Sequence, residues 1–260
     1  MTDGATTFRA PAAAYDLYMG AWSRPLAATF ADAAGVHAGD HVLDVGCGTG
    51  ALTAELAHRV GAALVAAVDP SEPSVAACAA AIVGADVRVG GAETLPFADA
   101  TFDVALCQLV VNFMADARVG VAEMRRVTRP GGTVAACTWD YRDGMTMLRV
   151  FWDAATALDP TAPHEGRVMP FCTPDDLDHL WRDVGLADVR ADELVVERVY
   201  PGFDDFWEPF TLGVGPGGSY CASLDEPQRD ALRAECFRLL ESPAGPLRMT
   251  ARAWFVRGSS

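Results

Sequence analysis

The chain has 260 residues and contains no lysine, so all 20 of its basic residues other than histidine are arginines. A protein without lysine has no side-chain amine that can form a Schiff base with a carbonyl compound or with pyridoxal phosphate. The composition therefore excludes aldolases of the Schiff-base type and enzymes that depend on pyridoxal phosphate.

Paired cysteines, metal-ligand spacings and long apolar runs are absent as well. The seven cysteines are scattered and never form a C-x-x-C pair, which is typical of reduced thiols in a cytoplasmic protein. The five histidines have no ligand spacing with cysteines or acids, so we expect no metal. No apolar run approaches the ~20 residues of a membrane span, and no signal-peptide pattern is visible. We therefore expect a cytoplasmic location.

Positive charge is scarce, and the net charge is −15. The electric field of a chain with this negative charge repels phosphate backbones and anionic lipid surfaces. We expect a small-molecule partner, no nucleic acid and no membrane, while a monomer and a homodimer both remain open. Apolar residues make up 51% of the chain, which indicates a globular protein, and the length suits a single domain spanning residues 1–260.

The most informative stretch is HVLDVGCGTG at residues 41–50, where a short apolar run ends at an acid and three glycines follow. Asp44 precedes Gly46, Gly48 and Gly50, and a helical pattern begins directly after the loop. Glycines allow a close approach between backbone and ligand, and the next helix offers free N–H groups. The spacing is G-x-G-x-G rather than the dinucleotide fingerprint G-x-G-x-x-G, which argues against a nicotinamide cofactor.

A second apolar run, residues 64–69, ends at Asp69, which lies 19 positions after Gly50. An acid at this distance from a glycine loop suits a ribose, whose two hydroxyls a carboxylate accepts as a pair. The alternative interpretation is local, because Asp69 would then cap the helix that begins after it, with Ser71 as the N-cap and Glu72 in the first turn. We favour the ribose interpretation.

Two further blocks, residues 87–97 and 101–113, complete a series that resembles the motifs of class I methyltransferases, which use S-adenosylmethionine (SAM). With the following turn and strand, the resemblance covers about residues 41–139. It implies that the glycine loop lies against the methionine part of SAM, that Asp44 orders the amino group, and that Asp69 holds the ribose. S-adenosylhomocysteine (SAH) would be the product.

The third block departs from the family pattern, because Gly91 stands where the family has an acid that receives the adenine amino group. The resemblance then leaves adenine to the Ala92 backbone or to Glu93. In the fourth block it places Gln108 and Asn112 near the SAM amino group and the methyl acceptor, with capping of a strand or turn as the alternative. The cofactor contacts predicted from the four blocks are Asp44, Gly46, Cys47, Gly48, Gly50, Asp69, Pro70, Ala92, Glu93, Gln108 and Leu109.

The segment YDLYMGAWSR at residues 15–24 resembles the N-terminal segment of the ubiquinone/menaquinone-biosynthesis and sterol-type small-molecule methyltransferases. The resemblance implies that Tyr15 closes over SAM and that Met19 lies beside it. Arg24 would meet the SAM carboxylate or, alternatively, pair with a surface acid.

Apolar runs that alternate with helical patterns between residues 41 and 138 indicate an α/β fold with parallel strands. The family resemblance implies a Rossmann-like sheet of seven strands, mostly parallel with the last antiparallel, flanked by helices. We expect the last two strands at 188–196 and 249–256. Turn residues at 130–132 should precede a strand at 133–139, and Thr173 should cap a helix.

Three segments exceed what such a sheet requires, approximately residues 10–36, 140–172 and 199–247. They are rich in aromatic residues, and we expect them to form a helical cap over the crevice beyond the carboxyl ends of the strands. Such a cap would enclose an apolar or aromatic small molecule, although a helical mini-core that packs on itself is the alternative. The predicted acceptor contacts are Asn112, Trp139, Tyr141, Trp152 and Tyr220.

These patterns predict a methyltransferase that transfers a methyl group from SAM to an oxygen, nitrogen or carbon atom of a small molecule, with secondary or specialised metabolism as its context. The alternatives are a SAM-binding partner subunit without methyl transfer and, less favoured, a nicotinamide-dependent oxidoreductase. A base is needed only for a neutral hydroxyl, amine or acidic carbon. We leave the catalytic residue unassigned among Asp140, Tyr141, His164, Glu165 and Tyr220.

Overall fold

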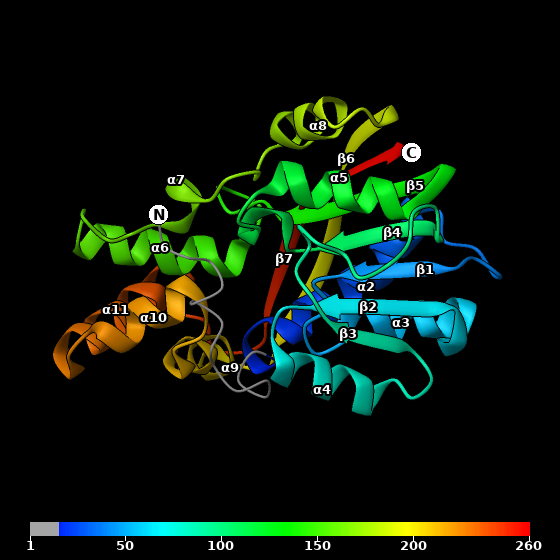
Figure 1. Cartoon of the computed structure of the whole chain (residues 1–260). Helices are drawn as coiled ribbons and strands as arrows, with labels where there is room; N and C mark the ends of the chain where they lie inside the picture. The colour runs from blue at the N-terminus through cyan, green and yellow to red at the C-terminus, as the bar shows by residue number, and fades with distance from the viewer. Residues whose placement is uncertain (1–15) are drawn as a thin grey trace. The chain divides into compact units, whose positions relative to one another are not determined.

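A computed structural model describes residues 16–260 of the chain, so Tyr15 lies outside the described residues. Seven strands form one sheet in the order β3-β2-β1-β4-β5-β7-β6 (Figure 1). The strands are β1 (Val42–Val45), β2 (Val65–Asp69), β3 (Asp86–Val89), β4 (Phe102–Gln108), β5 (Thr128–Trp139), β6 (Ala187–Tyr200) and β7 (Leu247–Ser259).

The first five strands pair in parallel, and β1 lies between β2 and β4. The chain runs from β1 outward through β2 to β3 and then returns to the other side of β1 as β4. This reversal of strand order is the place where open α/β sheets bind ligands, beyond the carboxyl ends of the strands.

Strand β7 runs antiparallel to β5. The amide of Gly131 donates to the carbonyl of Ser260 at 2.8 Å, whereas the amide of Asp140, nine residues later, donates to the carbonyl of Arg252 at 3.0 Å. Residue numbers thus rise along one strand as they fall along the other. The Rossmann-like sheet of seven strands with the last antiparallel is therefore confirmed.

Helices and short turns connect the strands. The helices are α2 (Ala21–Ala34), α3 (Ala51–Val60), α4 (Glu72–Ala81), α5 (Ala117–Val127), α6 (Thr146–Leu158), α7 (Glu165–Val168), α8 (Pro174–Asp183), α9 (Phe203–Trp207), α10 (Gly215–Ser223) and α11 (Glu226–Leu239). The shorter helical segments are the π-helix η2 (Asp16–Gly20) and the 3-10 helices η3 (Ala62–Leu64), η4 (Val111–Phe113) and η5 (Glu208–Leu212).

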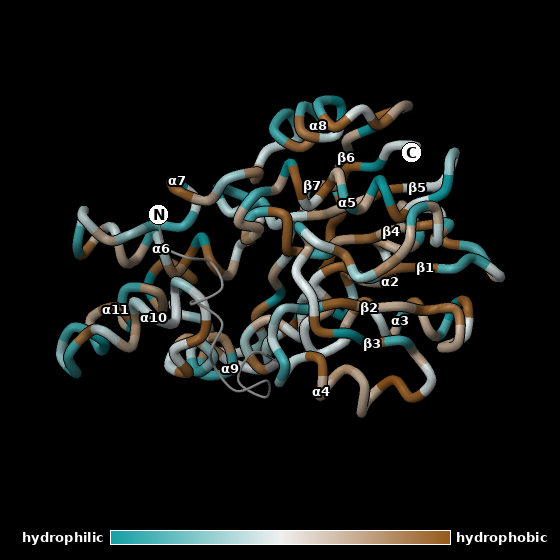
Figure 2. The backbone as a smooth tube through the Cα atoms, in the orientation of Figure 1, coloured by the Kyte–Doolittle hydropathy of each residue, from teal (hydrophilic) through white to brown (hydrophobic). Residues whose placement is uncertain are grey.

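Helix α5 shows how local sequence places an element on the core. Asp116 caps it by accepting a hydrogen bond from the amide of Val119 at 3.1 Å. Val121, Met124 and Val127 recur every three residues and are fully buried, together with the apolar side chains of β1, β2 and β4. In Figure 2 the tube along β2 and β4 has mainly the hydrophobic colours, in line with this core.

The chain divides into two compact units, which we call the helical unit and the glycine-loop unit. Of the described residues, the helical unit comprises 16–22, Trp139–Met169 and Val195–Ala253. The glycine-loop unit comprises Ser23–Thr138, Pro170–Leu194 and Trp254–Ser260. Most of the predicted segments 140–172 and 199–247 falls in the helical unit. A single domain with a cap over the crevice stays a prediction.

One expected boundary is wrong, and two expected caps are confirmed. The turn predicted at 130–132 lies inside β5, where Gly131 has φ +77° and the backbone pairs with the end of β7. The two glycines therefore lie within the strand, at an irregularity in its register against β4, and do not form a turn before it. Ser71 and Thr173 cap α4 and α8 as expected, since each side chain accepts a backbone amide three residues later.

Candidate functional site

The glycine loop joins β1 to α3 in a backbone conformation that favours glycine. The φ angles are +80° at Gly46 and +95° at Gly50. A Cβ on Gly46 would lie 2.4 Å from a methyl of Val110, and one on Gly50 would lie 2.6 Å from Cδ1 of Ile82. Both positions thus require glycine for packing as well as for conformation.

Gly48, between them, differs from its neighbours. It also has a positive φ, +52°, but a Cβ added there would meet no atom within 4 Å. The preceding amides of Gly46 and Cys47 donate to the carbonyl of Val68 at 2.8 and 3.0 Å and so fasten the loop to β2. The loop is therefore fixed at its base and open beside Gly48, as close contact with a ligand requires.

Asp69 stands at the end of β2 and faces this loop. Its Oδ2 accepts the amide of Gly48 at 2.9 Å, and its Oδ1 accepts the amide of Ser71 at 2.9 Å. Burial raises the pKa of Asp69, and the two amides oppose the shift. Because a carboxylate has about four acceptor positions, both oxygens can still receive a ribose hydroxyl. The local capping role is therefore observed, and it leaves room for the predicted ribose role. Pro70 beside it is exposed.

Asp44 is 1% exposed at the end of β1. Its Oδ2 accepts the hydroxyl of Thr53 at 2.6 Å, while its Oδ1 has no hydrogen-bond partner among residues 16–260. Burial raises its pKa to about 7; the Thr53 hydroxyl opposes this shift and Asp69 adds to it. A buried acceptor without a donor is costly, so this oxygen suits a donor group of a ligand.

Gln108, at the end of β4, offers a second such oxygen. Its Nε2 donates to a backbone carbonyl of α2 at 3.0 Å, and its Oε1 is buried without a partner in the described part of the chain. Asp44 pairs with Leu106 of β4 and with Ala67 of β2. Because side chains two residues apart share a sheet face, Asp44, Asp69 and Gln108 project from one face at the ends of three neighbouring strands.

In the third block, the acid Glu93 binds another segment of the protein itself. Ala92 is buried in the core, and Glu93 binds the chain before α5 through its Oε1, which accepts the amides of Ala115 and Asp116 at 2.8 and 3.3 Å. Glu93 thus anchors a loop with one carboxylate oxygen. Adenine contacts by Ala92 and Glu93 stay a prediction.

Leu109, directly after β4, has φ +63°, a strained value for a residue other than glycine. Its amide donates to the carbonyl of Cys137 at 2.8 Å, and the chain then turns so that Val110 packs on Gly46. Such strain is concentrated at functional positions, and the cofactor contact of Leu109 stays a prediction. Asn112 is buried in η4, and its predicted role in acceptor binding stays a prediction.

The N-terminal candidates are distributed over both units. Met19 is buried in η2 of the helical unit, whereas Arg24 is exposed in α2 of the glycine-loop unit. Tyr15 lies outside the described residues. Cofactor contacts by these three residues stay predictions.

The aromatic acceptor candidates belong to the helical unit. Trp139, Tyr141 and Trp152 are buried, and Tyr220 is half-buried with its ring centroid 5.5 Å from that of Trp152. Phe151 meets Trp152 edge-on, with the two ring centroids 5.2 Å apart. Such packing is what a helical mini-core requires, and acceptor contacts by these residues stay a prediction.

Among the candidate bases, three differ sharply in their surroundings. Asp140 is bound to Arg252, whose Nε and Nη2 lie 3.0 and 2.6 Å from its Oδ2. His164 caps α7 through Nδ1, and burial lowers its pKa. Glu165 is 2% exposed, its Oε1 accepts the amide of Gly217 at 3.2 Å, and burial raises its pKa to about 7.

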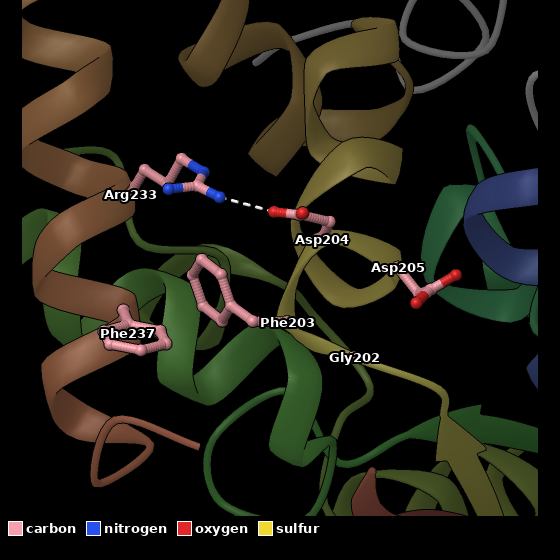
Figure 3. Close-up of a pocket in the computed structure, with 6 residues that line it drawn as sticks. All are labelled: Gly202, Phe203, Asp204, Asp205, Arg233 and Phe237. Carbon is pink, nitrogen blue, oxygen red and sulfur yellow. Dashed lines mark hydrogen bonds and ion pairs between the residues drawn. The ribbon is translucent and has the colours of Figure 1, made fainter. Parts of the chain in front are cut away.

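A shallow pocket of about 380 Å³ lies in the helical unit at α9 and α11 (Figure 3). Arg233 forms an ion pair with Asp204 and lies over the ring of Phe203, which contacts Phe237 edge-on at 5.0 Å. Figure 3 shows Asp205 on the far side of α9 from that ion pair. The charge of Arg233 is already matched, so the pocket gives no indication of a ligand.

In residues 16–260, no group of three or more histidine, cysteine or acidic side chains is placed to hold a metal ion. No helix in that range is long and apolar enough to cross a membrane.

Sequence reasoning missed Thr53, which orients Asp44 and is fully buried in α3. The available signal was a hydroxyl residue on the first turn of the helix after the glycine loop. At that position a helix side chain lies close to the end of the preceding strand.

Comparison with known proteins identifies the family. The methyltransferase-domain family matches residues 43–136, the segment that contains the glycine loop, Asp69 and Gln108. A demethylmenaquinone methyltransferase from Roseiflexus castenholzii is 34% identical over 164 residues, 56% of this chain and 68% of that protein. The chain belongs to the class I SAM-dependent methyltransferases. The cofactor of this family is SAM.

A second relative is matched over a smaller share of both chains. A ubiquinone biosynthesis O-methyltransferase from Rhizobium etli is 38% identical over 117 residues, 44% of this chain and 46% of that protein. The chain thus spans about half the length of this relative. The solved phosphoethanolamine N-methyltransferase 2 of Haemonchus contortus, in complex with SAH, has a TM-score of 0.59 at 15% identity, covering 96% of this chain and 56% of that one. This likeness supports the methyltransferase fold.

Proposed function

We propose that the protein transfers a methyl group from SAM to an oxygen, nitrogen or carbon atom of a small molecule. One observation carries the proposal, namely the buried oxygens of Asp44 and Gln108 that have no donor in the described chain. An ammonium group has three N–H donors and would satisfy both oxygens, and the amino group of SAM is such a group.

The other side chains fit the rest of the cofactor. When bound, SAM supplies a methyl group that its sulfonium already activates. The protein then has to position the reactants and exclude water. Asp69 would hold the ribose hydroxyls, the open space beside Gly48 would admit the cofactor to the backbone, and Asp44 with Gln108 would orient the amino group.

The proposal also includes a small molecule as the methyl acceptor and a cytoplasmic location for the protein. Relatives named for ubiquinone and menaquinone biosynthesis support a small acceptor, and the net charge of −15 disfavours nucleic acid. Seven free cysteines within the described residues agree with a reducing, cytoplasmic location.

The test is calorimetric titration of the protein with SAM, SAH and NAD⁺ in parallel. We expect micromolar binding of SAM and SAH, equivalent to roughly −8 kcal/mol, and no binding of NAD⁺. Binding of NAD⁺ alone would overturn the assignment. Methyl transfer is then assayed with a panel of phenols, amines and 2-oxo acids, and tight SAM binding without transfer to any of them would favour a non-catalytic partner subunit.

A further inference from the structure

Strand β3 forms one edge of the sheet within the glycine-loop unit. The strand order places it at the end, and β2 is its only strand neighbour among residues 16–260 (Figure 1). Three of its four residues, Asp86, Arg88 and Val89, are exposed. An edge strand presents backbone N–H and C=O groups that can pair with a further strand. The residues along this edge decide which partner it fits.

The backbone of β3 faces β2 at every second residue. Directly after the strand, the amide of Gly90 donates to the last carbonyl of β2 at 3.0 Å. Because successive backbone amides of a strand point to opposite sides, Asp86 and Arg88 also direct their N–H and C=O groups toward β2. Those of Val87 and Val89 point away from the sheet, to the side where a further strand would pair.

The side chains of β3 are charged on one face of the sheet and apolar on the other. On the first face, Nη2 of Arg88 lies 2.6 Å from Oδ2 of Asp86 in an ion pair whose two side chains are about half exposed. On the second face, Ala85 and Val87 pack against the buried cluster that contains Cys78 of α4. A partner strand must therefore match a pair of opposite charges and a row of apolar residues.

A second copy of β3 matches both faces in one antiparallel register. Two copies related by a twofold axis perpendicular to the sheet run antiparallel, and residues whose backbone groups point outward then lie opposite one another. With Val87 opposite Val87, Asp86 of each chain lies opposite Arg88 of the other. The two neighbouring registers place Asp86 opposite Asp86 or Arg88 opposite Arg88. Opposite charges on directly facing residues stabilise a pair of strands, and like charges destabilise it.

The surface beside this edge carries no charge. Residues 73–85, which include most of α4 and the turn before β3, contain no charged side chain, although the whole chain has a net charge of −15 (Figure 1). Ala79 and Ala80 of α4 are exposed, and Val83 in the turn is 84% exposed. The net charge makes two copies repel one another, and an uncharged surface is the place where they can meet at the least electrostatic cost.

We propose that the protein forms a homodimer in which β3 pairs antiparallel with β3 of a second copy, in the register that places Val87 opposite Val87. The two seven-stranded sheets then form one continuous sheet. The dimer contains two interchain pairs of Asp86 with Arg88 and leaves the hydrogen bonds between β3 and β2 in place. The edge lies within the glycine-loop unit, and the proposal does not depend on methyl transfer.

The first test is sedimentation velocity of the full chain over a ~100-fold range of concentration up to ~200 µM. We expect the mass to rise with concentration from that of a monomer toward twice that value. Val87→Pro should remain monomeric throughout, because proline has no amide for the partner strand and the outward position leaves the pairing with β2 intact. The thermal midpoint of each variant at low concentration reports whether the monomer folds.

An exchange of charges tests the register. Asp86→Arg gives the edge two arginines and Arg88→Asp gives it two aspartates, so each single variant should dimerise at least ~10-fold more weakly than the parent. Both substitutions in one chain restore opposite charges and should return the Kd to within ~3-fold of the parent. A mixture of the two single variants should form a heterodimer, because the arginines of one chain then face the aspartates of the other.

Arg118→Asp is the matched control, because it also breaks an exposed ion pair, with Asp183, but lies on α5. It should dimerise like the parent. A parent chain that stays monomeric at every concentration, a folded Val87→Pro protein that still dimerises, or a mixture without heterodimer would overturn the proposal. If Val87→Pro does not fold, the exchange of charges decides. Dimerisation without SAH binding leaves this interface standing and rejects the proposed function, and SAH binding by a monomeric parent does the reverse.

Discussion

Asp44 is the residue whose surroundings say most about the cofactor. It is nearly fully buried, one oxygen is fixed by Thr53, and the other lacks a donor within residues 16–260. Its pKa of about 7 means that the carboxyl is partly protonated at neutral pH, in contrast to an exposed aspartate. A cationic ligand group would favour the charged form, so ligand binding and ionisation of Asp44 must be linked.

This linkage predicts that SAH binds more tightly as the pH rises from 5.5 to 7.5. Below a pKa of about 7, binding has to remove the proton of Asp44 first, which weakens the affinity by up to tenfold per pH unit. The measurement is the Kd of SAH by calorimetry across this range. Asp44→Asn should bind more weakly at pH 7.5 and show a flatter profile, and an unchanged slope in that variant would assign the titration to another group.

Asp69→Ala should weaken SAH binding at least ~10-fold because the two ribose hydroxyls lose their shared acceptor. The fold should remain, although the amides of Gly48 and Ser71 also lose their partner and the free energy of unfolding should fall by about 1–2 kcal/mol. Calorimetry and chemical denaturation measure the two effects. Asp205→Asn, an exposed change on α9, is the control. An Asp69→Ala protein with parental affinity would limit Asp69 to the capping role.

At the scale of elements, the local part of the fold was predictable and the long-range part was not. The strand, glycine loop and helix at residues 42–60, and the caps at Ser71 and Thr173, follow from rules that act over a few residues. Gly131 and Gly132 are residues typical of turns, yet their hydrogen bonds with Ser260 keep them inside β5. Local spacing carries no information about that partner.

The same limit applies to the candidate site. Asp44, Gly48 and Asp69 were predicted as cofactor contacts because motif spacing places them at or beside neighbouring strand ends, and the structure places them there. Glu165, by contrast, meets the amide of Gly217 across 52 positions of the chain, and no sequence spacing links the two residues.

The glycine loop gives a prediction that separates packing from ligand contact. Gly50→Ala should lower the free energy of unfolding by about 2–4 kcal/mol, because the new Cβ would clash with Ile82 and Cys78 in a left-handed backbone. Gly48→Ala should cost only the backbone strain, about 1–2 kcal/mol. Denaturation measures both.

The affinity for SAH is the second property in which Gly48→Ala and Gly50→Ala are compared. The space beside Gly48 is open in the chain itself, so an added methyl group harms the cofactor contact more than the fold. We expect Gly48→Ala to lose at least ~10-fold in SAH affinity despite its smaller loss of stability. Parental affinity in this variant would place the cofactor elsewhere along the loop.

At the scale of the whole molecule, the buried carboxyls and the net charge both lower the free energy of unfolding as the pH rises. Burial raises the pKa of Asp44 from 3.8 and that of Glu165 from 4.5, in both cases to about 7. The folded chain therefore holds more protons than the unfolded chain between these values, and the free energy of unfolding falls as the pH rises through them. Repulsion within a chain of net charge −15 adds to this trend.

We therefore expect the ligand-free protein to be more stable at pH 5 than at pH 8, with each carboxyl contributing on the order of a few kcal/mol. His164 opposes the trend, because its lowered pKa favours the folded state as the pH rises through its ordinary value of 6.5. Chemical denaturation at pH 5, 6, 7 and 8 measures the slope. A level or rising stability over this range would contradict the assignment of both buried carboxyls.

The two carboxyls lie in different units, and this makes their contributions separable. Asp44→Asn removes a titrating group from the glycine-loop unit, and Glu165→Gln removes one from the helical unit. If the units unfold in separate transitions, each variant should flatten the pH dependence of its own transition and leave the other unchanged. If they unfold together, both variants should flatten the same transition, and the double variant should flatten it most.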